Sequence, residues 1–242
     1  LSSSLPVGVT ISGGLAGDGD RFTDTWVYAD GQFRRGVVAA VALSGRALEV
    51  GYGSAGGWEA FGPYRTVTGS DGNVLHTLDD RPALGLYRDY LGDRADQLPA
   101  IALLFPLLIR SPDGSVELVR TVLGIDDEHQ TMTFAGDIPE GWTARLMRTT
   151  LDRLVDASAL AAEQSQQSLA EPELAIAVSC VGRRLVLGQR TDEELEAASE
   201  VLGRQAPLIG FYSYGELSPG GGSCELHNQT MTLTTLRERP PA

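Results

Sequence analysis

Residues 210–233 constrain the fold more than any other part of the chain, because they combine strand-forming residues with a dense set of polar side chains. The segment GFYSYGELSPGGGSCELHNQTMTL contains an aromatic run, a turn rich in Gly, Pro and Ser, and a second run. This order is typical of two strands joined by a turn. The polar side chains on these runs include Tyr212, Tyr214, Glu216, His227, Asn228 and Thr230. Buried polar groups cost free energy unless they are paired, so the segment predicts either a hydrogen-bonded network or a ligand site.

The C-terminal part of the chain predicts a strand, a helix and two further strands. Residues 174–180 form a continuous apolar run, as expected of a central strand. Thr191-Asp192-Glu193-Glu194 has the pattern of a capping box that opens a helix, and Gly203 is placed to end it. Strands are expected over 207–214 and 224–236.

Turn and helix signals divide the remainder. Asp30-Gly31 and Pro112-Asp113-Gly114 each predict a hairpin. Residues 82–91 predict a helix that ends at Gly92, and residues 149–168 predict a polar, Ala- and Gln-rich helix.

An internal similarity completes the expected fold. Segment 8–16 lines up with segment 210–218, since both begin with Gly and break in a Gly-rich turn. The expected fold is therefore α+β, with mixed, largely antiparallel sheets, a C-terminal βαββ unit and a duplicated strand-turn-strand unit.

Charge and composition exclude several functions. The formal net charge is −13, and every basic residue is Arg. A chain without Lys cannot form a Schiff base or use a P-loop Lys, and an acidic chain is unsuited to phosphate backbones, so no nucleic-acid partner is expected. No apolar run has membrane-spanning length, so no membrane insertion is expected. Leu1-Ser2-Ser3-Ser4 lacks the basic start of a signal peptide, and a cytoplasmic protein with reduced cysteines is expected.

Several motifs resemble the FIST family, a sensory domain of bacterial signalling proteins. They occur in the family's order over nearly the whole chain: Asp71-Gly72-Asn73-Val74-Leu75, Pro82-Ala83-Leu84, Val122-Leu123-Gly124-Ile125-Asp126, Ser179-Cys180-Val181-Gly182-Arg183, Gly210-Phe211-Tyr212-Ser213-Tyr214-Gly215-Glu216 and His227-Asn228-Gln229-Thr230. The resemblance implies that residues 1–80 are the later part of an N-terminal FIST-type region and that 81–242 are a C-terminal ligand-binding region. It also implies a domain that binds a small ligand and passes that state to a signalling partner.

Cys180 ends the apolar strand and Arg183 follows it, and the ends of such strands are where α/β sheets place ligands. Cys180 is in phase with Leu174, Ile176 and Val178, so it is expected to pack and to line a pocket without reacting. Arg183 is a candidate for binding a carboxylate ligand, and the alternative is solvent exposure or an ion pair with the acidic surface.

Other candidate site residues lie in segment 210–218 and in the similar segment 8–16. Glu216 either binds an amine or closes the loop by accepting backbone N–H groups. Tyr212 and Tyr214 are expected to point the same way, and either pack or line a cavity. Ser12 and Gly13 are expected to border the site with backbone groups.

His227 and Asn228 are neighbours on an expected strand, so they should point to opposite faces unless a bulge intervenes. A structural histidine is one interpretation of His227. Some bacterial FIST members bind haem and sense nitric oxide, so haem is a second interpretation, with His76, His129 and His227 as the candidate ligands.

The expected function is small-molecule sensing, with amino acids or related metabolites as the ligand and without a catalytic residue, metal or cofactor. One alternative is a cysteine-dependent hydrolase or transferase that uses Cys180 with His227. The other alternative is a haem-binding nitric oxide sensor.

Overall fold

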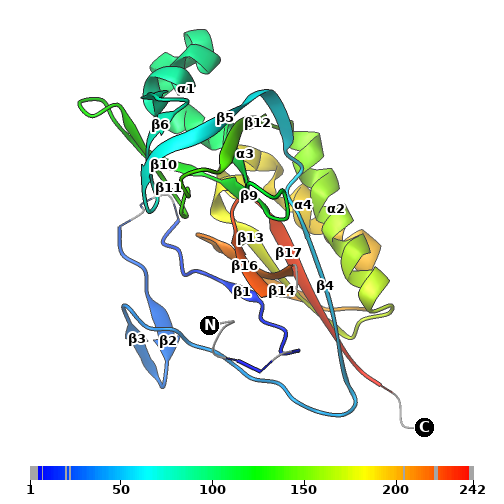
Figure 1. The fold of residues 1–242 in the computed structure, drawn as a ribbon. Helices are drawn as coiled ribbons and strands as arrows, with labels where there is room; N and C mark the ends of the chain where they lie inside the picture. Colours follow the sequence, from blue (N-terminus) through cyan, green and yellow to red (C-terminus); the bar gives the residue numbers. More distant parts are fainter. Residues whose placement is uncertain are drawn as a thin grey trace. The chain divides into compact units, whose positions relative to one another are not determined.

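The computed structural model describes residues 5–6, 8–19, 21, 23–203, 205–220 and 223–239, and it separates into two compact units (Figure 1). Unit 1 holds the described residues within Leu1–Gly57, Leu151–Leu226 and Thr230–Ala242. Unit 2 holds Trp58–Thr150 and His227–Gln229. This division by contacts differs from the predicted regions 1–80 and 81–242, which rest on family motifs and stay a prediction.

Unit 1 is built on a mixed sheet. Its strand order is β14-β13-β17-β4, with bounds β4 Leu48–Ala55, β13 Leu174–Cys180, β14 Leu208–Ser213 and β17 Met231–Glu238. Strand β13 is parallel to β14 and antiparallel to β17, which is antiparallel to β4. The crossover from β13 to β14 contains α3 Val181–Leu187, η4 Gly188–Arg190 and α4 Thr191–Leu202. The predicted strand, helix and parallel strand are therefore present.

Helix α2, Leu151–Ser168, packs on β4 and on α4 (Figure 1). The contact is close because both surfaces carry small residues. On the helix, Ala161 and Ser165 are fully buried. On the strand, Gly51 and Gly53 face the helix, and a Cβ at Gly53 would lie 2.0 Å from the Ala161 carbonyl oxygen. The absence of side chains at these two glycines sets the separation between α2 and β4.

Short strands complete unit 1. A small sheet has the order β1-β15-β16, with bounds β1 Gly13–Gly14, β15 Glu216–Gly220 and β16 Ser223–His227. Residues 221 and 222, in the predicted Gly/Pro/Ser turn, lie outside the described residues. Strands β2 Val27–Ala29 and β3 Gln32–Arg34 form the hairpin that Asp30-Gly31 predicts, with φ of 52° and 76° at these two residues.

The structure does not show segments 8–16 and 210–218 as the predicted duplicated strand-turn-strand unit. Segment 210–218 contains most of the long strand β14 and then enters β15. Segment 8–16 has only β1 as a strand among its described residues, and β1 pairs antiparallel with β15, Gly13 opposite Leu217. The two segments resemble each other because each is rich in small and apolar residues, but they are pairing partners rather than equivalent copies.

Unit 2 is an antiparallel sheet with a helix on it. The strand order is β10-β11-β6-β5-β12-β8-β9, with β7 paired to β6. The bounds are β5 Glu59–Asp71, β6 Val74–Leu78, β7 Arg81–Pro82, β8 Leu107–Arg110, β9 Glu117–Arg120, β10 Val122–Asp126, β11 Thr131–Phe134 and β12 Thr143–Arg148. The helical elements are α1 Ala83–Leu91, η2 Gly92–Gln97 and η3 Ala100–Leu104. Helix α1 buries Leu84, Leu86 and Tyr87 in the core of this unit.

Two local predictions need correction. The strand expected over 224–236 is interrupted, because Gln229 has a left-handed φ of 61° and separates β16 from β17. The capping box is not formed at α4: Thr191 donates from Oγ1 to the Gly188 carbonyl oxygen at 2.6 Å, and the preceding η4 supplies the start of the helix.

The α+β class with mostly antiparallel pairing is confirmed. Within the described residues, no helix is long and apolar enough to cross a membrane.

Candidate functional site

Two polar clusters lie at the carboxyl ends of β13 and β14 in unit 1, one on each face of the sheet. Cys180 lies opposite Ser213 in the parallel register, and Ser179 lies opposite Tyr212. Because successive side chains on a strand alternate between faces, the Ser179–Tyr212 pair and the Cys180–Ser213 pair point to opposite sides of the sheet. Ligands of open α/β sheets bind at this end of the strands, so both faces are candidate sites.

The first cluster is centred on the buried carboxylate of Glu194 in α4. Arg183 Nε and Nη2 lie 3.0 and 2.9 Å from Glu194 Oε2, and both side chains are fully buried. Tyr212 donates its hydroxyl to Oε1 at 2.8 Å, and Ser179 donates to the same oxygen at 3.3 Å. A buried charge needs pairing and hydrogen bonds to be tolerated, and this carboxylate has both.

All three nitrogens of the Arg183 guanidinium donate hydrogen bonds to acceptors within the protein. Its Nη1 donates to the Gly56 carbonyl oxygen at 2.9 Å. Its Nη2 donates to the Leu154 carbonyl oxygen at 2.7 Å and to Ser158 Oγ at 2.9 Å. Every guanidinium nitrogen therefore has a partner within unit 1, so the contacts describe an arginine that ties α2, α3 and α4 together. Its role as a ligand contact stays a prediction.

Tyr212 closes this cluster on the outside. Its ring lies under the guanidinium of the exposed Arg184, at 5.3 Å from the ring centroid. Burial raises the pKa of the Tyr212 hydroxyl, and the neighbouring Glu194 charge raises it further. The hydroxyl thus stays protonated and can keep donating to Glu194 throughout the physiological pH range.

The second cluster is centred on Glu216, which is fully buried. Ser213 Oγ donates to Glu216 Oε1 at 2.7 Å. The backbone N–H and the hydroxyl of Thr230 donate to Oε2 at 3.2 and 3.0 Å. Cys180 ends the adjoining strand, is 4% exposed, and donates its backbone N–H to the Thr230 carbonyl oxygen at 3.0 Å. Burial raises the pKa of Glu216 to about 7 against an ordinary value of 4.5, and the hydrogen bonds only partly offset this.

The glycine-rich N-terminal segment covers the second cluster. A Cβ at Gly14 would lie 2.7 Å from both Ser213 Cβ and Val178 Cγ1, so only glycine fits this close approach. Tyr214 lies beyond the end of β14 and donates its hydroxyl to the carboxylate of Asp18. The Tyr214 backbone N–H donates to the Leu15 carbonyl oxygen at 3.2 Å, and the Leu15 N–H donates to the Gly215 carbonyl oxygen at 2.9 Å. Tyr212 and Tyr214 therefore have different partners and do not act as a pair.

Glu216 predicts a specific pH dependence of stability. Its folded-state pKa is raised, so its contribution is fully present below pH 4.5 and is lost as the pH rises through about 7. One pKa unit corresponds to about 1.4 kcal/mol, so the loss is on the order of 3 kcal/mol. Urea unfolding of wild type and Glu216→Gln at several pH values tests this. The variant should lose less stability than wild type between pH 4.5 and 7.5, and parallel curves would show that Glu216 titrates normally.

A third feature lies in unit 2, where Asn228 and Gln229, which follow β16 in the sequence, are both buried. Asn228 Nδ2 donates to the His227 carbonyl oxygen at 3.0 Å, and Gln229 Nε2 donates to the Leu103 carbonyl oxygen at 3.5 Å. Trp58 Nε1 donates to the Gln229 carbonyl oxygen at 2.9 Å. The side-chain oxygens Asn228 Oδ1 and Gln229 Oε1 are buried and have no hydrogen-bond partner among the residues that the structure describes. Buried polar atoms are nearly always paired, so these two acceptors are suited to a ligand that donates hydrogen bonds.

Metal and haem chemistry has little support from these residues. The described part of the chain contains no group of three His, Cys, Asp or Glu side chains that could hold a metal ion. Of the haem candidates, His76 and His129 are exposed, and His129 Nδ1 lies 2.9 Å from Asp126 Oδ2. His227 is partly buried at the end of β16. Of the three candidates, only His227 offers a partly buried position for an axial ligand, so the haem alternative rests on this one residue.

The predicted site residues thus fall into several contact sets rather than one. Arg183 and Tyr212 meet at Glu194, Glu216 joins Ser213 beside the strand end of Cys180, and Tyr214 binds Asp18. Ser12 is exposed, and Gly13 pairs with β15. His227 and Asn228 belong to unit 2. That these residues bind a ligand stays a prediction.

Glu194 is the main residue that the sequence analysis missed as a member of the polar cluster. It was assigned to a capping box, yet it shares the buried face of α4 with Ala198 and Leu202, at spacings of four and eight residues. This helical spacing was the available signal.

Comparison with known protein families identifies the class of protein to which this chain belongs. The FIST N domain model matches residues 1–81, and the FIST C domain model matches residues 83–219. The chain therefore belongs to the FIST family, whose domains are generally described as small-ligand sensory domains in signal transduction.

The relatives are mycobacterial. The chain is 29% identical over 247 residues to the uncharacterized protein Rv0628c of Mycobacterium tuberculosis, a match that covers 96% of this chain and 62% of that protein. It is 24% identical over 241 residues to the uncharacterized protein Mb0898c of Mycobacterium bovis, covering 96% of this chain and 61% of that protein. The chain thus spans less than two thirds of the length of these relatives. No solved structure matches the chain significantly.

Proposed function

We propose that this chain is the ligand-binding part of a sensory protein and that its ligand is an amino acid or a related small metabolite carrying N–H donors. The observation that carries the proposal is a pair of buried acceptors, Asn228 Oδ1 and Gln229 Oε1, that have no partner within the described part of the chain. A protonated amine offers several N–H groups from one atom, so it can satisfy more than one acceptor. Charged donors also form stronger hydrogen bonds than neutral ones, which favours an ammonium group over an alcohol.

The position of Gln229 directly before Thr230 suggests how ligand binding is transmitted to Glu216. Gln229 has a left-handed backbone and is followed directly by Thr230, the residue that holds Glu216 through two hydrogen bonds. A ligand that shifts the backbone of Asn228 and Gln229 would change the geometry of the Thr230 bonds. Glu216 is buried with a raised pKa, so its protonation responds to any change in these donors. We propose that this coupling converts ligand binding into a conformational signal for a partner protein.

The test is a binding screen with Asn228→Ala. Single amino acids are titrated into wild type by calorimetry, and thermal unfolding is followed in parallel. For an amino acid that binds wild type, the variant should bind roughly 10- to 100-fold more weakly, which is the loss of one hydrogen bond to a charged group. The unliganded variant should be nearly as stable as wild type, because the substitution also removes a buried unpaired oxygen.

Asn73→Ala is the matched control in the same unit. Asn73 Nδ2 donates to the Phe134 carbonyl oxygen at 2.7 Å, so this amide is structural. Asn73→Ala should cost stability and leave affinity unchanged. The proposal fails if no amino acid binds, or if both alanine variants bind like wild type. A Soret band after addition of haemin, or thioester hydrolysis that disappears in Cys180→Ala, would favour the haem sensor or the cysteine enzyme instead.

A further inference from the structure

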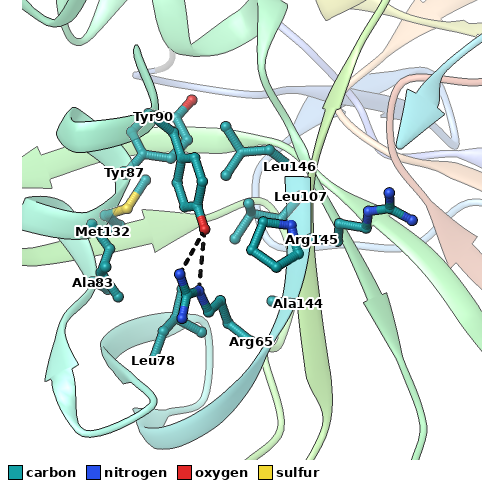
Figure 2. A pocket seen from close by; sticks show the side chains of 12 residues that line it. Arg65, Leu78, Ala83, Tyr87, Tyr90, Leu107, Met132, Ala144, Arg145 and Leu146 are labelled. Atoms are coloured by element: carbon teal, nitrogen blue, oxygen red, sulfur yellow. Dashed lines mark hydrogen bonds between the residues drawn. The ribbon is translucent and has the colours of Figure 1, made fainter. Parts of the chain in front are cut away.

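Unit 2 contains a small cavity beneath α1 that is separate from the amide pair. Its floor is apolar and is formed by buried side chains that include Leu78, Ala83, Leu107, Met132 and Leu146 (Figure 2). Its volume of about 10 Å³ has room for about one water molecule. Among the described residues that line it, none is Asp or Glu, although the chain carries a net charge of −13.

Tyr90 and Arg65 close this cavity. Figure 2 shows the Tyr90 ring standing at the cavity with its hydroxyl directed at the Arg65 guanidinium. Arg65 Nε and Nη2 both donate to the Tyr90 oxygen, at 3.1 and 3.0 Å. The remaining nitrogen, Nη1, donates to Asp79 Oδ2 at 3.0 Å, which fixes the orientation of the guanidinium.

The edge of the Arg65 guanidinium formed by Nε and Nη2 indicates which kind of ligand this cavity could bind. Two parallel N–H groups on one edge of a guanidinium match the two oxygens of a carboxylate. Here a single phenol oxygen accepts both of them. Tyr90 is a neutral acceptor, so it binds this edge more weakly than a carboxylate would. The edge is held in place by Asp79 and borders an apolar cavity.

We propose that this cavity is a second ligand site, for a small monocarboxylate with a short apolar tail. The carboxylate takes the Nε and Nη2 edge of Arg65 and displaces the Tyr90 hydroxyl. The Tyr90 ring then swings out, and the tail takes the space that the ring leaves together with the small cavity beside it. Binding is therefore coupled to movement of the last turn of α1, where Tyr90 lies. The inference is independent of the amide pair, because neither Asn228 nor Gln229 lines this cavity.

The test uses the full chain with ¹³C-methyl methionine and sodium isovalerate as the probe. The chain has three Met residues, and only Met132 lines the cavity, so Met147 and Met231 are internal controls. Titration up to about 20 mM is sufficient, because a ligand of this size is expected to bind with a Kd on the order of 1 mM. The Met132 signal should shift and the other two should not. In the series acetate, propionate, butyrate, each methylene should tighten binding about fourfold.

Three variants and one neutral analogue decide the outcome. Arg65→Lys keeps the charge but loses the paired edge, and should bind at least about tenfold more weakly. Tyr90→Phe removes the competing oxygen and should bind about threefold or more tightly. Arg110→Lys, on exposed Arg110 of β8, should bind like wild type. The proposal is overturned if Met132 does not respond, if isovaleramide binds as well as isovalerate, or if either Arg65→Lys or Tyr90→Phe leaves the affinity unchanged.

Discussion

Replacing Arg183 with alanine is expected to lower the free energy of unfolding by about 3–5 kcal/mol, because it leaves the buried Glu194 carboxylate without its countercharge. The guanidinium also holds the carbonyl oxygens of Gly56 and Leu154, which lie on different segments of unit 1. Those acceptors lose their partner at the same time, and buried acceptors left unpaired add to the cost. Urea unfolding followed by circular dichroism measures the change.

Arg184→Ala is the matched control for this prediction. Arg184 is the next residue and is exposed, and its side chain stacks on the Tyr212 ring. Its loss should cost no more than about 1 kcal/mol. The double variant Arg183→Met, Glu194→Leu removes both charges and should be more stable than Arg183→Ala. Equal effects of Arg183→Ala and Arg184→Ala would contradict the structural role assigned to Arg183.

Strands and helices with strong local signals could be predicted from the sequence. The run 174–180 is strand β13 with the same bounds, because a central strand buried on both faces leaves a continuous apolar run. Gly92 and Gly203 follow the ends of α1 and α4, as predicted. Gly92 has the positive φ of the expected αL stop but not its ψ, which is −130°. Asp30-Gly31 makes the predicted hairpin, since both residues tolerate a left-handed backbone.

The polar clusters could be predicted only in part, because their partners are distant in sequence. Glu216 and Tyr212 stood out as polar residues on expected strands. That Tyr212 would meet Glu194, eighteen residues away, depends on the crossover packing of α4 on the sheet. The break at Gln229 was equally hidden, because Gln is uncommon at positive φ and no glycine marks the position. No sequence pattern indicated that the Nε and Nη2 groups of Arg65 would both donate to the Tyr90 hydroxyl.

Gly53→Ala is expected to lower the free energy of unfolding by about 3 kcal/mol or more, at the upper end of the range for overpacking. The added Cβ would lie 2.0 Å from the Ala161 carbonyl oxygen and 2.8 Å from the Ser165 backbone nitrogen. Both atoms belong to the backbone of α2, so no side-chain rotation relieves the contact, and the helix must move away from β4. Displacing α2 also disturbs its packing on α4, which carries Glu194.

Gly124→Ala is the comparison that isolates this effect. Gly124 also lies in a strand, β10, and a Cβ there would meet nothing within 4 Å. Its alanine variant should be as stable as wild type or slightly more stable, because alanine reduces the freedom of the unfolded chain. Thermal unfolding of the two variants measures the difference, which should be several degrees for a chain of this size, at about 2–4 °C per kcal/mol. If Gly53→Ala unfolds at the same temperature as Gly124→Ala, α2 does not rest on β4 as closely as the structure describes, and the position assigned to the Glu194 cluster would have to be revised with it.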